Sequence, residues 1–495
     1  MDSGPTTGGL NNKGAIVTIA GENFGATRGT SFVTVGGAAV DNYLSWSNTK
    51  VVVQLGSAAK TGDIAVVNGT GNPSNGIPFT VRTGPIYFVS ATGTGNGAYA
   101  TPMAPSAVYS KIAPGATFYF RGGSYTGMYG YTGYSDYNFS LGGGKSGAAG
   151  NPIAFVGYPG EVATFSGHTG VFHLRDSDVA TSTSGYLTIA NLRMICKVSC
   201  VDGASNGYYI YKIGGKAVRL INNVMSATYT GNTMTGVVTV ANDGWRVYGN
   251  EIKDTGITPA YNNNHGIYVQ VGSSDVDLAW NYLHDLRMGH VIQVHTDTAF
   301  KYENVRIHDN LITAAHQGDS RGINVGNTSA GTYGSIYNNV LSNLGQDFSA
   351  IAIYSGSWNI TNNTLHNINA STGMIWLSSQ YSAAKPTAVI TNNILYSDGA
   401  SPYLSLVSGT VATQVTASNN LYFNKGNGPS IDKAPVNANP LFVNAAAGNF
   451  HLQSTSPAIG QGISSLSSLV TADADGISKL LKVSYDIGAF TYVAP

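Results

Sequence analysis

Apolar and polar residues alternate in short runs along most of the chain, and this pattern predicts β-strands. In pairs such as Ile267/Val269 and Val276/Leu278 a single residue separates two apolar ones, which places both on the same face of a strand. Strands rise roughly 3.3 Å per residue, so three short strands with their turns occupy about 28 residues. The runs recur on that scale and suggest a repeating unit of three strands.

A recurring asparagine with apolar neighbours divides these runs into repeats of 24 to 32 residues. A period in this range is typical of a solenoid, in which each repeat buries its apolar face against its neighbours. Asparagine suits the turns, because it tolerates the left-handed conformation and its amide can hydrogen-bond to the equivalent residue one coil away. We therefore expect a parallel β-helix with a structural ladder formed by Asn191, Asn223, Asn250, Asn281, Asn310, Asn339, Asn363, Asn393 and Asn420.

The first 82 residues have a different pattern. Short alternating strands are separated by glycine and asparagine turns roughly every ten residues, which predicts a small β-sandwich. The phrases VTIAGENFG and SFVTVGG resemble the immunoglobulin-like IPT/TIG domain of bacterial surface and secreted proteins. The resemblance implies a spacer or binding module for residues 1–82, with no catalytic role.

The segments at both ends of the repeats resemble right-handed parallel β-helix proteins of the pectin-lyase-like superfamily. The first opens with IYFVSATGTGNG, and weak helical spacing from Pro105 to Ile112 predicts the short helix that closes the first coil in that group. The second, NANPLFVNAAAGNFHLQSTSPAIGQG, resembles the closing segment. We expect an all-β chain with a sandwich at 1–82, a right-handed parallel β-helix at 86–425 and a capping segment packed on it at 426–495.

Composition and charge mainly exclude some classes of binding partner. Charged residues are 10% of the chain, and glycine is 63 of 495 residues, which suits a turn-rich all-β protein. The 25 basic and 25 acidic residues cancel, so no global charge favours nucleic acid or anionic membranes. No apolar run is long enough to span a bilayer. We expect a monomer that is secreted or displayed on a bacterial cell surface, by means of an export signal outside the printed sequence.

The superfamily resemblance also implies where a substrate binds. In that group the asparagine ladder marks the turn between the second and third sheets, and the first sheet floors the substrate groove. Alternation around the inward apolar pairs of the first-sheet strands sends the residues between and after each pair outward. One outward column is then Tyr268, Gln293, Asn324, Ala352 and Trp376, and the next is Gln270, His295, Gly326, Tyr354 and Ser378.

These columns are polar and aromatic, which suits a sugar chain. Six of the ten histidines fall within residues 265–316, and histidine is the commonest general acid or base near neutral pH. His295 lies in a groove column, so His295 and Tyr268 are the candidate acid and base. The candidate substrate-binding residues are Gln270, Gln293, Asn324, Arg287, Arg321, His265, His290, Tyr354 and Trp376.

The two columns contain no carboxylate, whereas a glycosidase needs two that lie about 5–10 Å apart. β-Elimination requires instead a base, an acid for the leaving oxygen, and a donor or cation for the developing enolate. We therefore favour a polysaccharide lyase acting on a uronic-acid-containing glycan. A glycoside hydrolase that uses the loop residues Asp297 and Asp319 is the close alternative, and a non-catalytic glycan-binding surface protein or adhesin is the third.

The local charge does not favour a polyanion. From Asn250 to Arg321, nine acidic and five basic residues give a net charge of −4 with neutral histidines. A bound Ca²⁺ can reverse this sign, as in pectate-type lyases of the superfamily, and no CxxC or HExxH spacing indicates another metal. We expect no certain cofactor, with Ca²⁺ the one candidate. Asp277 and Arg306 occupy equivalent positions on adjacent coils and predict an exterior ion pair of little energetic weight.

Overall fold

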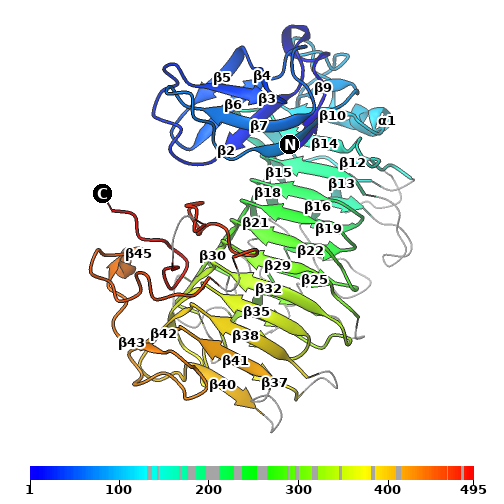
Figure 1. Cartoon of the computed structure of the whole chain (residues 1–495). Helices are drawn as coiled ribbons and strands as arrows, with labels where there is room; N and C mark the ends of the chain where they lie inside the picture. The colour runs from blue at the N-terminus through cyan, green and yellow to red at the C-terminus, as the bar shows by residue number, and fades with distance from the viewer. Residues whose placement is uncertain are drawn as a thin grey trace. The chain divides into compact units, whose positions relative to one another are not determined.

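The computed structural model describes residues 1–494 except for fifteen short ranges: 131–136, 142–143, 167–169, 175–184, 197–210, 228–236, 254–264, 287–288, 296–299, 315–320, 345–347, 381–384, 408–413, 465–466 and 481–483. The chain divides into two compact units, Met1–Asp178 with Ser182–Ile195 and Gly214–Val224, and Val179–Thr181 with Cys196–Ile213 and Met225–Pro495. Figure 1 shows that strands make up nearly all of the regular structure, which confirms the all-β class.

Helices are short wherever the structure describes the chain. They are η1 (Leu10–Asn12), η2 (Pro105–Ala107), α1 (Val108–Lys111) and η3 (Ala445–Ala447). The pair η2 and α1 confirms the short helix expected from Pro105 onward, and it buries Val108 completely. None of the described helices has the length and apolar character that a membrane crossing requires.

The first unit begins with a two-sheet sandwich whose core contains Val17, Val35, Val53 and Val66. One sheet is ordered β1 (Ser3–Gly4), β8 (Ile77–Val81), β7 (Gly62–Val67), β3 (Phe32–Val35) and β4 (Ala38–Ala39). The other is ordered β2 (Ile16–Ala20), β6 (Lys50–Gln54) and β5 (Asn42–Trp46). The buried Tyr119 hydroxyl bonds to the backbone N–H and carbonyl of Ile16, which fixes the sandwich to the coil that follows.

The same unit continues into the first coils of a parallel β-helix. Its longest sheet is ordered β9 (Ile86–Val89), β10 (Thr117–Phe120), β14 (Ile153–Gly157), β17 (Leu187–Ala190) and β20 (Arg219–Ile221). The shorter sheets contain β11 (Gly123–Tyr125) and β15 (Ala163–Ser166), and β12 (Tyr129–Gly130), β13 (Tyr137–Ser140) and β16 (Gly170–Leu174). Three strands span the residues at which the chain passes between the units: β18 (Arg193–Cys196), β19 (Tyr211–Gly214) and β21 (Val224–Ala227).

The second unit contains the remaining coils, and each complete coil contributes one strand to each of three parallel sheets; β43 (Val436–Asn437) extends the third sheet alone. The first sheet comprises β22 (Val238–Ala241), β25 (Ile267–Gln270), β28 (His290–Val294), β31 (Arg321–Val325), β34 (Ile351–Ile353), β37 (Ile375–Ser378) and β40 (Leu404–Val407). The second sheet comprises β23 (Arg246–Tyr248), β26 (Asp277–Ala279), β29 (Val305–His308), β32 (Tyr333–Tyr337), β35 (Ser357–Thr361), β38 (Thr387–Thr391) and β41 (Val415–Ser418). The third sheet comprises β24 (Glu251–Lys253), β27 (Tyr282–His284), β30 (Leu311–Thr313), β33 (Val340–Ser342), β36 (Thr364–Ile368), β39 (Ile394–Ser397), β42 (Leu421–Phe423) and β43 (Val436–Asn437).

Stacked isoleucines set the register of the first sheet. Ile267, Ile292, Ile323, Ile351 and Ile375 pair in sequence from strand to strand. All five are 0% exposed, and full burial of such a side chain stabilises the fold by about 1.5–3 kcal/mol. A slip of one residue would turn these isoleucines toward solvent. Packing in the interior therefore also determines which residues lie on the outer face of the sheet.

The asparagine ladder runs through the turn between the second and third sheets. Asn281 is typical: its backbone N–H and its side-chain amide both donate to Oδ1 of Asn310, one coil on. At its C-terminal end the ladder stops on the carboxylate of Asp432, which accepts from the Asn420 amide at 2.7 Å. The prediction was wrong for Asn191, whose φ of 57° identifies it as the left-handed turn residue before the ladder. Leu192 takes the ladder position in that coil, and its N–H donates to Asn223 Oδ1.

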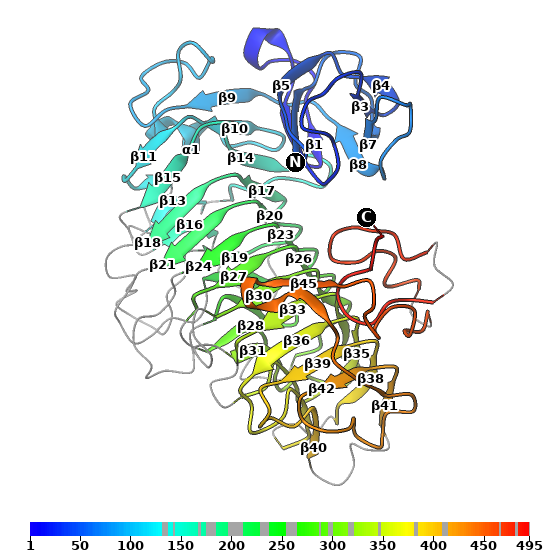
Figure 2. The ribbon, with the colours of Figure 1, turned by 90° about the vertical axis from the view of Figure 1, so that its left-hand side faces the viewer.

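The C-terminal segment lies against the outer face of the third sheet in the last coils (Figure 2). Phe442 and Phe450, from β44 (Phe442–Asn444) and β45 (Asn449–Leu452), pack on Val340, Ile394 and Leu421. The turn asparagines that precede ladder positions donate side-chain hydrogen bonds to its backbone; they are Asn338, Asn362, Asn392 and Asn419.

Candidate functional site

The candidate site is the outer face of the first sheet in the second unit. Tyr268 pairs with Gln293 and Gln293 with Asn324 in the strand registers, so the three side chains occupy successive rungs, as the alternation predicts. The same column continues through Ala352 to Trp376. Ala352 and Trp376 form a cluster of their own with Tyr354 and Phe348, separate from the stacked isoleucines of the interior.

The column is much less exposed than a surface groove was expected to be. Tyr268 and Gln293 are 9% exposed, Trp376 is 8% and Asn324 is 5%. Rungs about 4.8 Å apart shield one another, and Phe348 packs edge-on against Trp376 at 5.4 Å between ring centroids. The residues therefore lie on the outer side of the sheet but in a largely desolvated layer.

Several polar atoms in this layer have no hydrogen-bond partner in the part of the chain that the structure describes. They are Thr239 Oγ1, His290 Nδ1, Gln293 Oε1, Asn324 Oδ1 and Trp376 Nε1. Thr239 pairs with Tyr268, so four of the five belong to one column. More than nine in ten buried polar groups in native proteins are partnered, and a row of exceptions requires a reason. A ligand or bound water that supplies the missing partners is such a reason.

Two buried histidines lie at one side of the column. The His265 and His290 rings stack with centroids 5.8 Å apart, and the backbone N–H of His290 donates to His265 Nδ1 at 3.2 Å. Burial lowers the pKa of His265 to about 3 and lowers that of His290 well below its usual value. Both rings are therefore neutral at physiological pH. Arg321, which pairs in register with His290, places its guanidinium 4.9 Å from the Phe348 ring centre.

His295 lies in the second outward column, directly against Gly326. A Cβ on Gly326 would approach His295 Nδ1 to 2.4 Å, so only glycine leaves room for this ring. The Asn327 N–H donates to His295 Nδ1 at 3.2 Å. In the neutral tautomer that accepts this bond, the ring proton is on Nε2. His295 is thus oriented as a hydrogen-bond donor through Nε2, and its role as acid or base stays a prediction.

The remaining predicted residues fall into two groups. Tyr354 packs edge-on against Trp376 at 5.2 Å, and Gln270 is half-buried at the end of β25. Arg287, Asp297 and Asp319 lie outside the described residues. The structure therefore brings together ten of the thirteen predicted site residues on or beside one face.

The described residues do not fit a calcium site. Ca²⁺ takes roughly six to eight oxygen ligands, mostly carboxylates and carbonyls. The first-sheet strands contain no aspartate or glutamate, and Gln293 and Asn324 offer only two amide oxygens. No group of three or more histidine, cysteine, aspartate or glutamate side chains is arranged to hold a metal within the described ranges.

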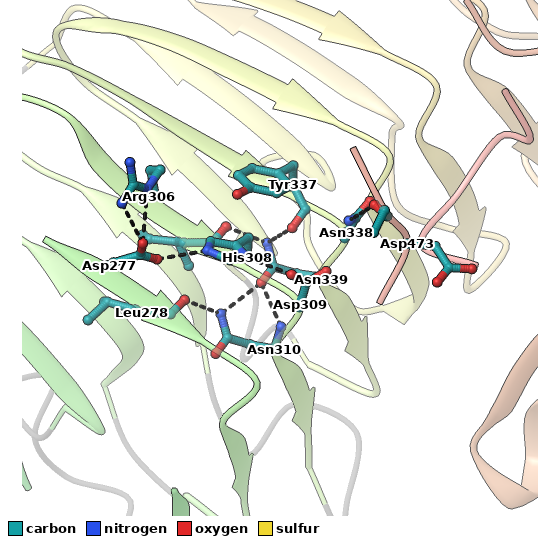
Figure 3. Close-up of polar contacts among 12 residues, drawn as sticks. Asp277, Leu278, Arg306, His308, Asp309, Asn310, Tyr337, Asn338, Asn339 and Asp473 are labelled. Atoms are coloured by element: carbon teal, nitrogen blue, oxygen red, sulfur yellow. Dashed lines mark hydrogen bonds and ion pairs between the residues drawn. The ribbon is translucent and has the colours of Figure 1, made fainter. Parts of the chain in front are cut away.

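A second polar cluster, on the outer face of the second sheet, was missed in the sequence (Figure 3). His308 Nε2 bonds to Asp277 Oδ1 at 2.7 Å and Nδ1 bonds to Asp309 Oδ2 at 2.6 Å. Arg306 Nε donates to the other Asp277 oxygen at 3.0 Å, and the Tyr337 ring stacks on His308 at 4.5 Å. The recurring His–Asp dipeptide, also present at His284–Asp285, is the signal that could have indicated this cluster.

The cluster corrects the view of Asp277 and Arg306 as an exterior pair of little weight. Asp277 is 4% exposed and is paired with two cations. Burial alone would raise its pKa, but His308 and Arg306 lower the pKa of Asp277 to about 2. Burial alone would lower the pKa of His308, but the bonds to Asp277 and Asp309 raise it to about 9. The cluster is a buried ionic network, so removal of one member is costly.

Comparison with known proteins agrees with this architecture. The IPT/TIG domain model matches residues 2–81, and a domain of unknown function, DUF5123, matches residues 358–462. Comparison with curated proteins finds no match. The pectate lyase Pel9A aligns with a TM-score of 0.50 and 15% identity, over 83% of this chain and 96% of its own.

Two further solved structures align less well. The catalytic unit of a GH87 α-1,3-glucanase from Streptomyces thermodiastaticus has a TM-score of 0.47 and 18% identity, over 83% of this chain and 78% of its own. A family 28 exopolygalacturonase from Yersinia enterocolitica has a TM-score of 0.35 and 10% identity, over 88% and 97%. The family model confirms the N-terminal IPT/TIG domain, and the likeness to Pel9A confirms the parallel β-helix fold.

Proposed function

We propose that this protein is an extracellular polysaccharide lyase that cleaves a uronic-acid-containing glycan by β-elimination on the outer face of the first sheet. One observation carries the proposal, namely the column of buried polar atoms at Thr239, Gln293, Asn324 and Trp376 that have no partner among the described residues. A glycan offers hydroxyl donors and ether-oxygen acceptors at short intervals along its length. It can therefore satisfy acceptors such as Gln293 Oε1 and donors such as Trp376 Nε1 together.

β-Elimination needs few protein groups. A base takes the proton from the carbon beside the uronate carboxyl, a C=C bond forms, the C–O bond to the leaving sugar breaks, and its oxygen takes a proton. We assign the proton transfer to Tyr268, which lies between Thr239 and Gln293 in the column. His295, with its ring proton on Nε2, donates a hydrogen bond to the charge that develops on the carboxylate.

Charge assigns a role to Arg321. It is the only lysine or arginine in the described first-sheet strands from β22 to β40, and the neighbouring His265 and His290 are neutral because burial lowers the pKa of each. A single guanidinium in a desolvated layer binds one carboxylate strongly and in a fixed orientation. Arg321 therefore selects the uronate whose adjacent carbon loses its proton, while Gln293, Asn324 and Trp376 bind neutral parts of the chain.

Hydrolysis on the same face requires carboxylates that the first-sheet strands lack. It would depend on Asp297 and Asp319, so elimination is the preferred chemistry. The pectate lyase of similar fold is an example of that chemistry on this scaffold. The proposal includes a secreted or surface-displayed monomer, in which the IPT/TIG domain serves as a spacer or binding module.

The test is incubation with a panel of acidic and neutral polysaccharides, followed through both the ultraviolet absorbance of unsaturated uronate ends and the release of reducing ends. We expect both signals together on a polyuronate, and a loss of roughly 10²–10⁴-fold in turnover for Tyr268→Phe with glycan affinity retained. Reducing ends without unsaturated ends would indicate the hydrolase. Tight glycan binding with neither signal would indicate the adhesin, and wild-type turnover in Tyr268→Phe would remove the assignment of the proton transfer.

A further inference from the structure

The outer face of the second sheet contains a groove that the proposed chemistry does not use. Its volume is about 420 Å³, within the range of small-molecule sites. Residues from four consecutive strands, β32, β35, β38 and β41, line it together with Asn304 and Gln414. Because these strands belong to the same coils as the first sheet, the groove lies on a different wall of the same unit.

The lining repeats from coil to coil. Tyr333 pairs with Ser357 and Ser357 with Thr387, which forms one row of hydroxyl side chains across three strands. A second row runs from Ser335 through Asn359 and Val389 to Thr416. The rungs are about 4.8 Å apart, which is close to the length of one pyranose unit in an extended chain. The groove thus presents similar hydrogen-bonding groups at intervals that match successive sugars.

None of the twelve residues that line the groove is charged. The next residue in the row beyond Ser335 is Arg306, and its charge is already matched by Asp277. A polyuronate would bring many negative charges to a groove whose described lining residues include no cation, so no ion pair would offset the cost of desolvating its carboxylates. Hydroxyl and amide groups suit an uncharged polyol instead.

Tyr333 supplies the aromatic surface of the groove. It is 47% exposed, although a ring of this size usually buries most of its area. Beneath the rim, Trp358 is 2% exposed, and its Nε1 donates to the Ser355 carbonyl at 3.1 Å. A Cβ on Gly334 would lie 2.4 Å from that indole, so glycine is required for the ring to reach this position. The groove therefore has a rigid base and one free aromatic face.

We propose that this groove is a binding site for a neutral glycan chain, with the sugar faces stacked on Tyr333 and the hydroxyls bonded to Asn359, Ser335 and Ser357. The site is independent of the lyase chemistry, because it shares no residue with the first sheet. It would hold the protein on a neutral polysaccharide while the other wall acts on its own substrate.

The experiment measures the affinity of the full chain for soluble neutral polysaccharides (a β-glucan, a xylan and a galactomannan) and for polygalacturonate, by isothermal titration in the Tyr268→Phe background. We expect at least one neutral glycan to bind and Tyr333→Ala to weaken that binding roughly tenfold or more. Asn359→Ala should weaken it less. Tyr282→Ala is the matched control, since Tyr282 is 40% exposed on the third sheet and lies outside the groove.

Three results would overturn the proposal: no affinity for any neutral glycan, equal affinities of Tyr333→Ala and the Tyr282→Ala control, or loss on Tyr333→Ala of polygalacturonate binding alone. Thermal unfolding of each variant serves as the folding check. Tyr333 is exposed, so its replacement should leave the unfolding midpoint unchanged.

Discussion

The outer faces of the first and second sheets bury polar side chains to a similar extent but satisfy them differently. On the second sheet, His308 is 7% exposed and each of its ring nitrogens bonds to a carboxylate. On the first sheet, His290 is 8% exposed and its Nδ1 has no partner within the described chain. The two faces belong to the same coils and share one scaffold.

The difference in hydrogen bonding between the two faces distinguishes a structural role from a ligand-binding role. A buried polar network with every partner in place rigidifies a fold, whereas a partly satisfied one costs stability. Such a cost persists where function requires it. The second-sheet cluster is therefore a structural element, and the first-sheet column is a surface prepared for a ligand. The following predictions are ordered from the largest expected effect to the smallest.

Removal of one charge from the second-sheet cluster should have the largest effect. Asp277→Ala leaves His308 and Arg306 without their shared counter-charge in a buried site, so the free energy of unfolding should fall by about 3–5 kcal/mol. Urea denaturation measures this directly. Glu303→Ala is the control, because Glu303 pairs with Lys301 on the surface and its removal should cost less than about 1 kcal/mol. Equal losses of unfolding free energy in the two variants would show that the cluster does not stabilise the fold.

The histidines of the two faces should give stability opposite dependences on pH. Because the pKa of His308 is raised to about 9, its contribution is complete below the unfolded value of about 6.5 and is lost as the pH rises through 9. Because the pKa of His265 is lowered to about 3, its unfolded form takes up the proton first, and stability is lost as the pH falls from about 6.5 toward 3. The His308 shift corresponds to a few kcal/mol, on the order of 3.

Urea denaturation at a series of pH values tests both signs. His308→Asn should flatten the alkaline side of the curve, and His265→Asn should flatten the acid side and leave the alkaline side unchanged. An alkaline slope that is the same in wild type and His308→Asn would contradict the assignment of the proton to the cluster.

Period-two alternation was sufficient to predict the register and the outward placement of the first-sheet column. A slip of one residue would have exposed Ile267 and its partners, so few other strand registers would keep these side chains buried. The ladder was harder to place, because the turn position and the ladder position both favour asparagine. Asn191 satisfies the first and was taken for the second, while in later coils a pair such as Asn362–Asn363 fills both.

Burial and long-range polar partners could not be predicted in the same way. The low exposure of Gln293 depends on the residues in the adjacent strands and on neighbouring aromatic groups. The sequence around Gln293 contains no information about these contacts. His308 has one partner next to it in sequence and another 31 residues earlier, on the coil before. Strand pairing brings His308 and Asp277 together, and only the complete stack of coils shows that the pair is shielded from water.

The most direct test of the central claim is one substitution made at two buried asparagines. Asn310 is 1% exposed, and its Oδ1 accepts from the Asn281 backbone N–H and side-chain amide. Asn324 is 5% exposed, and its Oδ1 has no partner among the described residues. Asn310→Leu should lower the free energy of unfolding by about 1–3 kcal/mol for each donor left unpaired and should leave glycan affinity intact.

Asn324→Leu should leave stability unchanged or raise it by up to about 1 kcal/mol, because it removes a buried amide oxygen that has no partner in the described chain, and it should weaken glycan binding. Urea denaturation and titration with the polyuronate substrate, carried out on both variants, decide the matter. If Asn324→Leu destabilises the fold as much as Asn310→Leu and binds the glycan as wild type does, the first-sheet column is structural and the proposed site is contradicted.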